Sequence, residues 1–206
     1  RILRTSFRTN MNSERPFGSF TSPGHFQTAR DIAAAGTVLL KNEGGILPLN
    51  VPRGGRILVV GENAIKKMSV GGGSSNLKTV HEINPLDGLR EAFEGKAEID
   101  WARGYVGDMS TAYNKVSTGQ DLGESRSAEE LMAEAVEKAS QADVVVFFGG
   151  LNKSGYQDNE GTDRLQITLP YGQEEVIRAV AGVNPNIVVV NISGSPVAMP
   201  WADCVP

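Results

Sequence analysis

The segment Asp143-Val-Val-Val-Phe-Phe-Gly149 is the strongest strand candidate of the sequence, and it decides the fold class. A continuous run of β-branched and aromatic residues closed by glycine is typical of a strand that is buried on both faces. Asn186–Ile192 and Arg56–Gly61 repeat this pattern, and Ala97–Ala102 repeats it more weakly. Strands of this kind predict a mostly parallel sheet that is covered by helices on both faces.

Helical patterns fill the gaps between these strands. Pro85–Phe93 is a short candidate, and Ser127-Ala-Glu-Glu130 has the capping-box spacing that begins a longer one. Gln173–Val180 follows Pro170 and carries an apolar stripe, and Gln27–Leu40 carries a packing face of small residues. Because strands and helices alternate, the sequence predicts an α/β fold, an open α/β sandwich.

Composition excludes several classes of protein. Of the 206 residues 40% are hydrophobic and 21% are charged, and no apolar run approaches the roughly 18 residues of a membrane span. The net charge of −4, without a basic cluster, argues against a nucleic-acid partner. Cys204 is the only cysteine, and His25 and His81 are isolated, so no intrachain disulfide or metal-ligand spacing is present.

The expected domain organisation is a polar tail followed by one incomplete domain. Residues 1–23 have no sustained periodicity and are expected to be a linker or the end of a preceding domain, and residues 24–206 form the sandwich. The chain starts without methionine or a signal-peptide pattern, and it stops at Trp201–Pro206, where a helix would normally follow. We therefore expect a piece of a longer protein.

Ligands of open α/β sheets bind beyond the carboxyl ends of the strands, and two of these ends are unusual here. After the first strand, Gly61–Ser75 contains a run of glycines. Its spacing matches neither the P-loop nor the dinucleotide fingerprint, which argues against nucleotide binding. A plain surface loop and a loop that packs on a neighbouring domain and rims its pocket both remain open.

After the strongest strand, Gly149–Arg164 holds a tyrosine, three acids, two cations and four glycines that can bend the chain, before Leu165–Pro170. A carboxyl group beside an aromatic ring suits sugar chemistry, because the acid can donate a proton while the ring packs on a sugar face. A polar loop without catalytic function can have the same composition, so the residues alone leave both readings open.

Four motifs resemble those of family 3 glycoside hydrolases, in that family's order along the chain. They are Val38-Leu-Leu-Lys-Asn42 with Leu47-Pro-Leu49, Val60-Gly-Glu-Asn-Ala64 with Gly72-Gly-Ser-Ser75, Glu160-Gly-Thr-Asp-Arg164 with Leu169-Pro-Tyr-Gly-Gln173, and Ser193-Gly-Ser-Pro-Val197 with Trp201. The first and third together are specific.

This resemblance implies a retaining β-glycosidase of the β-glucosidase type, which hydrolyses terminal β-D-glucosyl residues of oligosaccharides or aryl glucosides. In the family, a (β/α)8-type barrel domain supplies an aspartate nucleophile, and the sandwich domain supplies the acid/base glutamate, here Glu160. No counterpart of the nucleophile motif is found in these residues, so the chain alone is expected to be inactive. The resemblance implies no cofactor, and it favours a secreted or periplasmic location without excluding the cytoplasm.

Further site residues follow from the same loops. Tyr156, Asp158 and Ser74 are expected to contact substrate, although Tyr156 could equally be an ordinary exposed tyrosine. Asp158 competes with Glu160 for the acid role. No metal ligand is expected.

Neighbouring residues have structural interpretations. Asp163 and Arg164 are expected to form an ion pair that pins the loop, and Trp101 and Trp201 are expected to be core residues. Lys41 is expected to cap the carbonyl groups at the end of its own helix.

Two alternatives remain at this point. A β-xylosidase of the same family is one, because this domain does not determine which sugar the pocket admits. A non-catalytic α/β binding module that kept the fold is the other.

Overall fold

The computed structural model describes residues 1–8, 17–69, 77, 79–107, 112–113, 116–117 and 120–206. The chain divides into two compact units, Arg1–Leu40 and Lys41–Pro206. This division falls later than the boundary after residue 23 that the composition suggested.

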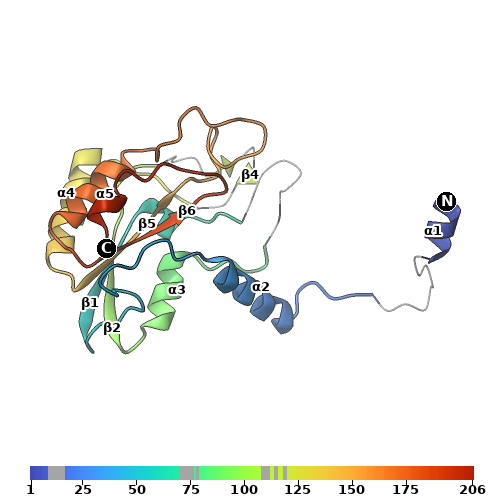
Figure 1. The fold of residues 1–206 in the computed structure, drawn as a ribbon, viewed down its shortest axis with the longest axis horizontal. Coiled ribbons are helices and arrows are strands. Elements are labelled where there is room, and N and C mark those ends of the chain that lie inside the picture. The colour runs from blue at the N-terminus through green and yellow to red at the C-terminus, as the bar shows by residue number, and fades with distance from the viewer. Residues whose placement is uncertain (9–16, 70–76, 78, 108–111, 114–115, 118–119) are drawn as a thin grey trace. The chain divides into compact units, whose positions relative to one another are not determined.

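The second unit is built on a parallel sheet of four strands (Figure 1). The strands are β1 (Gly55–Val60), β2 (Ala97–Ala102), β5 (Val144–Gly150) and β6 (Ile187–Ile192). Their order is β2-β1-β5-β6, and every neighbouring pair is parallel. The predicted open, parallel α/β sheet is therefore confirmed, and each strand lies within one residue of its expected position.

Alternation along the strands divides the core into two layers, because successive side chains of a strand point to opposite faces. Leu58 and Val60 of β1 pack with the residues of α4 and α5, whereas Ile57 and Val59 pack with the residues of α3. All seven residues of β5 are buried. The sequence has continuous apolar runs because both faces of the sheet are covered.

Three helices provide this cover, with α3 on one face and α4 and α5 on the other (Figure 1). They are α3 (Pro85–Ala92), α4 (Ala128–Ser140) and α5 (Gln173–Ala181). The predicted capping box of α4 is present: Ser127 accepts the amide of Glu130, and Glu130 accepts the amide of Ser127. At α3 the side chain of Asn84 accepts a hydrogen bond from the backbone N–H of Asp87, without the reciprocal bond of a capping box.

Short elements complete the unit. A single 3-10 turn, η1 (Glu62–Ala64), follows β1, and another, η3 (Ala202–Cys204), lies near the end of the chain. β3 (Ala112–Tyr113) and β4 (Val116–Ser117) pair antiparallel in a small sheet that the sequence did not predict. No helix of the described residues is long and apolar enough to cross a membrane.

The first unit contains α1 (Ile2–Arg8) and α2 (Pro23–Gly36). Helix α1 lies in the segment that was expected to be irregular. The predicted helix 27–40 was wrong at both ends, because Ser22 caps the amide of His25 and Pro23 occupies the first turn. At the other end Thr37 is already extended, so Val38–Leu40 follow the helix instead of belonging to it.

The prediction for Lys41 was also wrong, because its helix ends before it. The Lys41 ammonium donates instead to the carbonyl groups of Ala202 (3.0 Å) and Val205 (2.7 Å), and so ties the start of the second unit to the end of the chain. The amide of Asn42 exchanges two hydrogen bonds with the backbone of Leu47, at 2.9 and 3.0 Å. Lys41 and Asn42 of the first motif thus fix the segment before β1, Lys41 by bonds to residues 202 and 205 and Asn42 by bonds to Leu47.

Candidate active site

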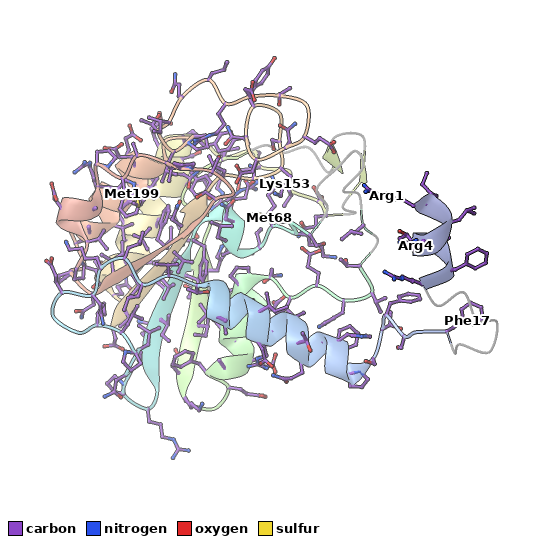
Figure 2. The ribbon with its side chains drawn as sticks, turned by 45° about the vertical axis from the view of Figure 1, so that its right-hand side comes forward. Arg1, Arg4, Phe17, Met68, Lys153 and Met199 are labelled. Carbon is purple, nitrogen blue, oxygen red and sulfur yellow. The ribbon has the colours of Figure 1, made fainter. Side chains whose placement is uncertain are left out.

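The carboxyl ends of the four parallel strands meet at one edge of the sheet, where the segments after β1, β2, β5 and β6 come together. Figure 2 labels Met68 and Lys153 on the segments that follow β1 and β5. Residues 151–169, here called the acidic loop, connect β5 to the turn before α5. The candidate site is built on this loop.

The acidic loop begins at a backbone position that only glycine fits. Gly150 has φ of 119°, and a Cβ there would lie 2.0 Å from the carbonyl oxygen of Ile192. The side-chain amide of Gln173, which is 1% exposed, accepts the N–H of Gly150 and donates to its C=O, both at 2.8 Å. Gln173 ends the Leu169–Gln173 motif, so this part of the motif fixes where the loop starts.

Hydrogen bonds within the loop fold it into two tight turns. The N–H of Asp158 donates to the carbonyl of Asn152 at 2.9 Å. The N–H of Tyr156 donates to Oγ1 of Thr162 at 2.9 Å, and that hydroxyl donates to Oδ1 of Asn159 at 2.6 Å. The loop therefore has a defined path although it contains no helix or strand.

Glu160 lies between these turns, and its side chain is exposed. Tyr156 is 55% exposed and has a positive φ of 61°, a backbone region that costs energy for a residue other than glycine. Ser74, the third expected substrate contact, lies outside the described residues. Glu160 and Tyr156 are thus exposed on one loop, and their contacts with a substrate stay predictions.

Asp158 is turned toward the body of the domain. Its carboxylate accepts the N–H of Gly194 and the hydroxyl of Ser195 (3.0 Å), both in the turn after β6. Arg164 reaches the same segment by donating to the carbonyl of Pro196. Among the ion pairs of the described residues, none joins Asp163 to Arg164, so the expected pair was wrong, because the guanidinium is directed to a backbone carbonyl instead.

A buried cluster of charges lies at the carboxyl ends of β1 and β2. Glu62, which is fully buried, accepts hydrogen bonds from Lys66 (3.2 Å), from Arg103 (2.7 Å) and from the N–H of Gly107 (2.8 Å). Arg103 also donates to the carbonyl of Leu122 at 2.7 Å. The cluster joins the segment after β1, the segment after β2 and the segment before α4, and no role was predicted for it from the sequence. A charged residue directly after Val60-Gly61, with lysine four residues later, was the signal available.

A second buried group connects this cluster to the acidic loop. The Asn63 side chain donates to the carbonyl of Leu151 at 3.3 Å, and the Asn63 N–H donates to the hydroxyl of Tyr105, also at 3.3 Å. That hydroxyl donates in turn to the carbonyl of Phe148 at 3.4 Å. Burial raises the pKa of Tyr105 above its ordinary value, so the hydroxyl keeps its proton. The start of the loop is therefore held from the β1 side as well.

The tryptophans are core residues, as expected. Trp201 is 5% exposed and packs in the layer that contains α4 and α5. Trp101 packs against the other layer, and its indole N–H donates to the carbonyl of Gly61 at 3.1 Å. Trp201 is thus buried in the core, and Trp101 is half-buried against it.

The described residues offer no group of three or more His, Cys, Asp or Glu side chains that could hold a metal ion. A small cavity of about 40 Å³ is lined by residues such as Arg56, Asp100 and Lys138, none of which belongs to the acidic loop. Among the described residues of the acidic loop, Glu160 and Asp163 present exposed carboxyl groups.

Comparisons with known proteins show the family to which the fold belongs. Beta-glucosidase BoGH3A of Bacteroides ovatus is 44% identical over 211 residues, which cover 100% of this chain and 27% of that protein. Thermostable beta-glucosidase B of Acetivibrio thermocellus is 34% identical over 98% of this chain and 24% of its own length. An exo-alpha-(1->6)-L-arabinopyranosidase of Bifidobacterium breve is 33% identical over 89% of this chain and 23% of its own length. The chain thus spans about a quarter of the length of these relatives.

Among solved structures, the crystal structure of Bifidobacterium adolescentis GH3 beta-glucosidase superposes with a TM-score of 0.72 at 30% identity, over 99% of this chain and 26% of that one. The model of the glycosyl hydrolase family 3 C-terminal domain matches residues 37–206. The chain therefore belongs to glycosyl hydrolase family 3, as a C-terminal domain of its β-glucosidase-like enzymes.

Proposed function

We propose that this chain supplies the acid/base group of a retaining β-glycosidase of the β-glucosidase type, and that Glu160 is that group. The nucleophile would be an aspartate of a (β/α)8-type barrel domain that acts together with this chain. The substrate would be a β-linked oligosaccharide or aryl glucoside with a terminal glucosyl residue.

The observation that carries the proposal is the exposed carboxyl group of Glu160 on a loop that is anchored on both sides. A hydrogen-bonded turn flanks it at Asp158 and another at Thr162, and the loop starts at the clamped Gly150. A general acid needs this combination, because it must reach a substrate outside the domain and still be held in one place.

In the proposed mechanism, Glu160 first protonates the glycosidic oxygen as the leaving group departs and the aspartate bonds to the sugar. Glu160 then removes a proton from the water that hydrolyses the glycosyl-enzyme. The two carboxyl groups of a retaining enzyme lie about 5–5.5 Å apart. Because one is supplied from another domain, we expect the chain without the barrel to hydrolyse no aryl β-glucoside.

The relatives support the reaction class more strongly than the sugar. Two of them are named as beta-glucosidases, whereas the third is named as an exo-alpha-(1->6)-L-arabinopyranosidase. A domain shared by enzymes with different sugars is consistent with a sandwich that supplies the acid and a barrel that selects the sugar.

The test uses Glu160→Ala in the complete enzyme, meaning this chain together with the barrel domain. Aryl glucosides whose leaving group needs a proton should react about 10²–10⁴-fold more slowly, the usual contribution of general acid catalysis. Dinitrophenyl glucoside needs no proton, so its glycosylation step should be spared. An equal loss of kcat/KM for both substrates would contradict the proposal, and Glu175→Gln, which changes an exposed carboxyl group on α5, is the control.

A further inference from the structure

Both carboxylate oxygens of Asp158 are occupied by donors from one turn. Oδ2 accepts the N–H of Gly194, and Oδ1 accepts the hydroxyl of Ser195 at 3.0 Å. Hydrogen bonds to an ionised carboxylate are about twice as strong as those between neutral groups. A side chain held in this way is directed at the protein and not at a sugar.

The backbone of Asp158 closes a ring of hydrogen bonds around the start of the acidic loop. Its N–H donates to the carbonyl of Asn152 at 2.9 Å, and the N–H of the preceding Leu151 donates to the carbonyl of Ile192 at 2.8 Å. Leu151 and Asn152 are both buried. These bonds connect Ile192 at the end of β6 to Leu151, Asn152 to Asp158, and Asp158 back to Gly194. A movement of Asp158 therefore breaks a hydrogen bond to the turn after β6.

The turn after β6 is shaped for this carboxylate. A Cβ at Gly194 would lie 3.1 Å from the nearer oxygen of Asp158, which is tighter than an ordinary contact. Because glycine has no Cβ, the carboxylate of Asp158 can approach closely enough to accept the N–H of Gly194. The Ser193–Val197 motif and the acidic loop, far apart in the sequence, thus meet at Gly194, Ser195 and Pro196.

Glu160 follows Asp158 by two residues in the sequence. On its other side, Thr162 is held by the N–H of Tyr156. The position of the Glu160 backbone is thus determined from both sides, by Asp158, which is bonded to the turn after β6, and by Thr162, which is bonded within the loop. A displacement of about 1 Å in a catalytic group can reduce the rate about 10²-fold.

We propose that Asp158 is a positioning residue for the acid/base glutamate: it fastens the acidic loop to the Gly194–Ser195 turn and contacts no substrate. This inference rests on the proposed function of Glu160. It assigns the loop's two neighbouring acids different roles, one fixed inward and one presented outward.

The test is Asp158→Asn in the complete enzyme, with Ser195→Ala as a milder variant that removes one of the two donors. For aryl glucosides that need a protonated leaving group, Asp158→Asn should lower kcat/KM by up to about 10²-fold. For dinitrophenyl glucoside, kcat/KM, which reports the glycosylation step, should be spared. Ser195→Ala should show the same selectivity with a smaller loss, and Glu175→Gln should show neither.

Three outcomes would overturn the inference. A raised KM for both substrates would assign Asp158 to sugar binding, an equal loss of kcat/KM for both at unchanged KM would assign it to stability alone, and unchanged kinetics would remove it from the site. The proposed function has a separate test, because Glu160→Ala must show the leaving-group selectivity whatever Asp158 does. In this chain alone, the Gly194 amide should exchange with solvent faster in Asp158→Asn, and unchanged exchange would contradict the contact itself.

Discussion

Replacing Glu62 with glutamine should destabilise the domain strongly. Glu62 is buried with two cations, Lys66 and Arg103, whose exposed fractions are 2% and 4%, and Arg103 also pairs with Glu124 at 3.6 Å. Glutamine keeps the volume of the side chain but removes its negative charge. The two cations then lose the carboxylate that accepts their hydrogen bonds at 3.2 and 2.7 Å.

The magnitude follows from burial. Removing one partner of a buried ion pair usually costs about 3–5 kcal/mol, because the remaining charge is left without compensation. The pair Glu174–Arg178 has the same spacing of four residues as Glu62–Lys66, but its side chains are 28% and 45% exposed. An exposed pair of this kind contributes only about 0.3–0.5 kcal/mol. The two substitutions therefore compare the same chemistry at two degrees of burial.

Urea unfolding of the chain, followed by tryptophan fluorescence, measures the difference. With a slope of about 1–3 kcal/mol/M, Glu62→Gln should lower the midpoint by about 1 M or more, whereas Glu174→Gln should leave it nearly unchanged. Trp201 is buried and reports the loss of the core. If Glu62→Gln costs no more than Glu174→Gln, the cluster does not hold the strand ends as described.

Two further predictions concern the same edge of the sheet. Gln173→Leu should lower the free energy of unfolding by about 2–4 kcal/mol in the same urea assay, because the buried N–H and C=O of Gly150 both lose their partner; a change below about 0.5 kcal/mol would contradict the clamp. The Arg126 guanidinium, hydrogen-bonded to Glu124, lowers the pKa of that carboxyl to about 2. The ionised Glu124 contributes its full stabilisation above its ordinary pKa, and this contribution is lost as pH falls from about 5 to about 2. Glu124→Gln should therefore make the free energy of unfolding less dependent on pH in this range. An unchanged pH dependence would contradict the lowered pKa of Glu124.

The sheet was predictable from the sequence because burial on both faces leaves a local pattern. The β5 run, all of it buried, was recognised within one residue, and the Ser127 capping box marked the start of α4 correctly. Helix α2 was misplaced because its apolar residues continue past Gly36 into an extended segment. Apolar residues alone cannot tell where a helix ends.

The site was predictable only in part, because its contacts join distant segments. Glu62 and Arg103 are 41 residues apart, and Asp158 and Gly194 are 36 apart. No local period marks such pairs. The acidic loop itself could be located, since it follows the strongest strand. Asp158 points inward because it is bonded to the turn at Gly194 and Ser195, and no pattern in the sequence shows that this turn lies next to it.

The most direct test of the central claim is azide rescue in the complete enzyme. In Glu160→Ala, dinitrophenyl glucoside should still form the glycosyl-enzyme, which then accumulates because no base activates water. Added azide needs no base, so it should speed turnover and yield the β-glycosyl azide, with retained configuration. If rescue occurs in Asp158→Ala and not in Glu160→Ala, the acid is Asp158; if neither variant responds to azide, the acid/base group lies outside the acidic loop and the account is wrong.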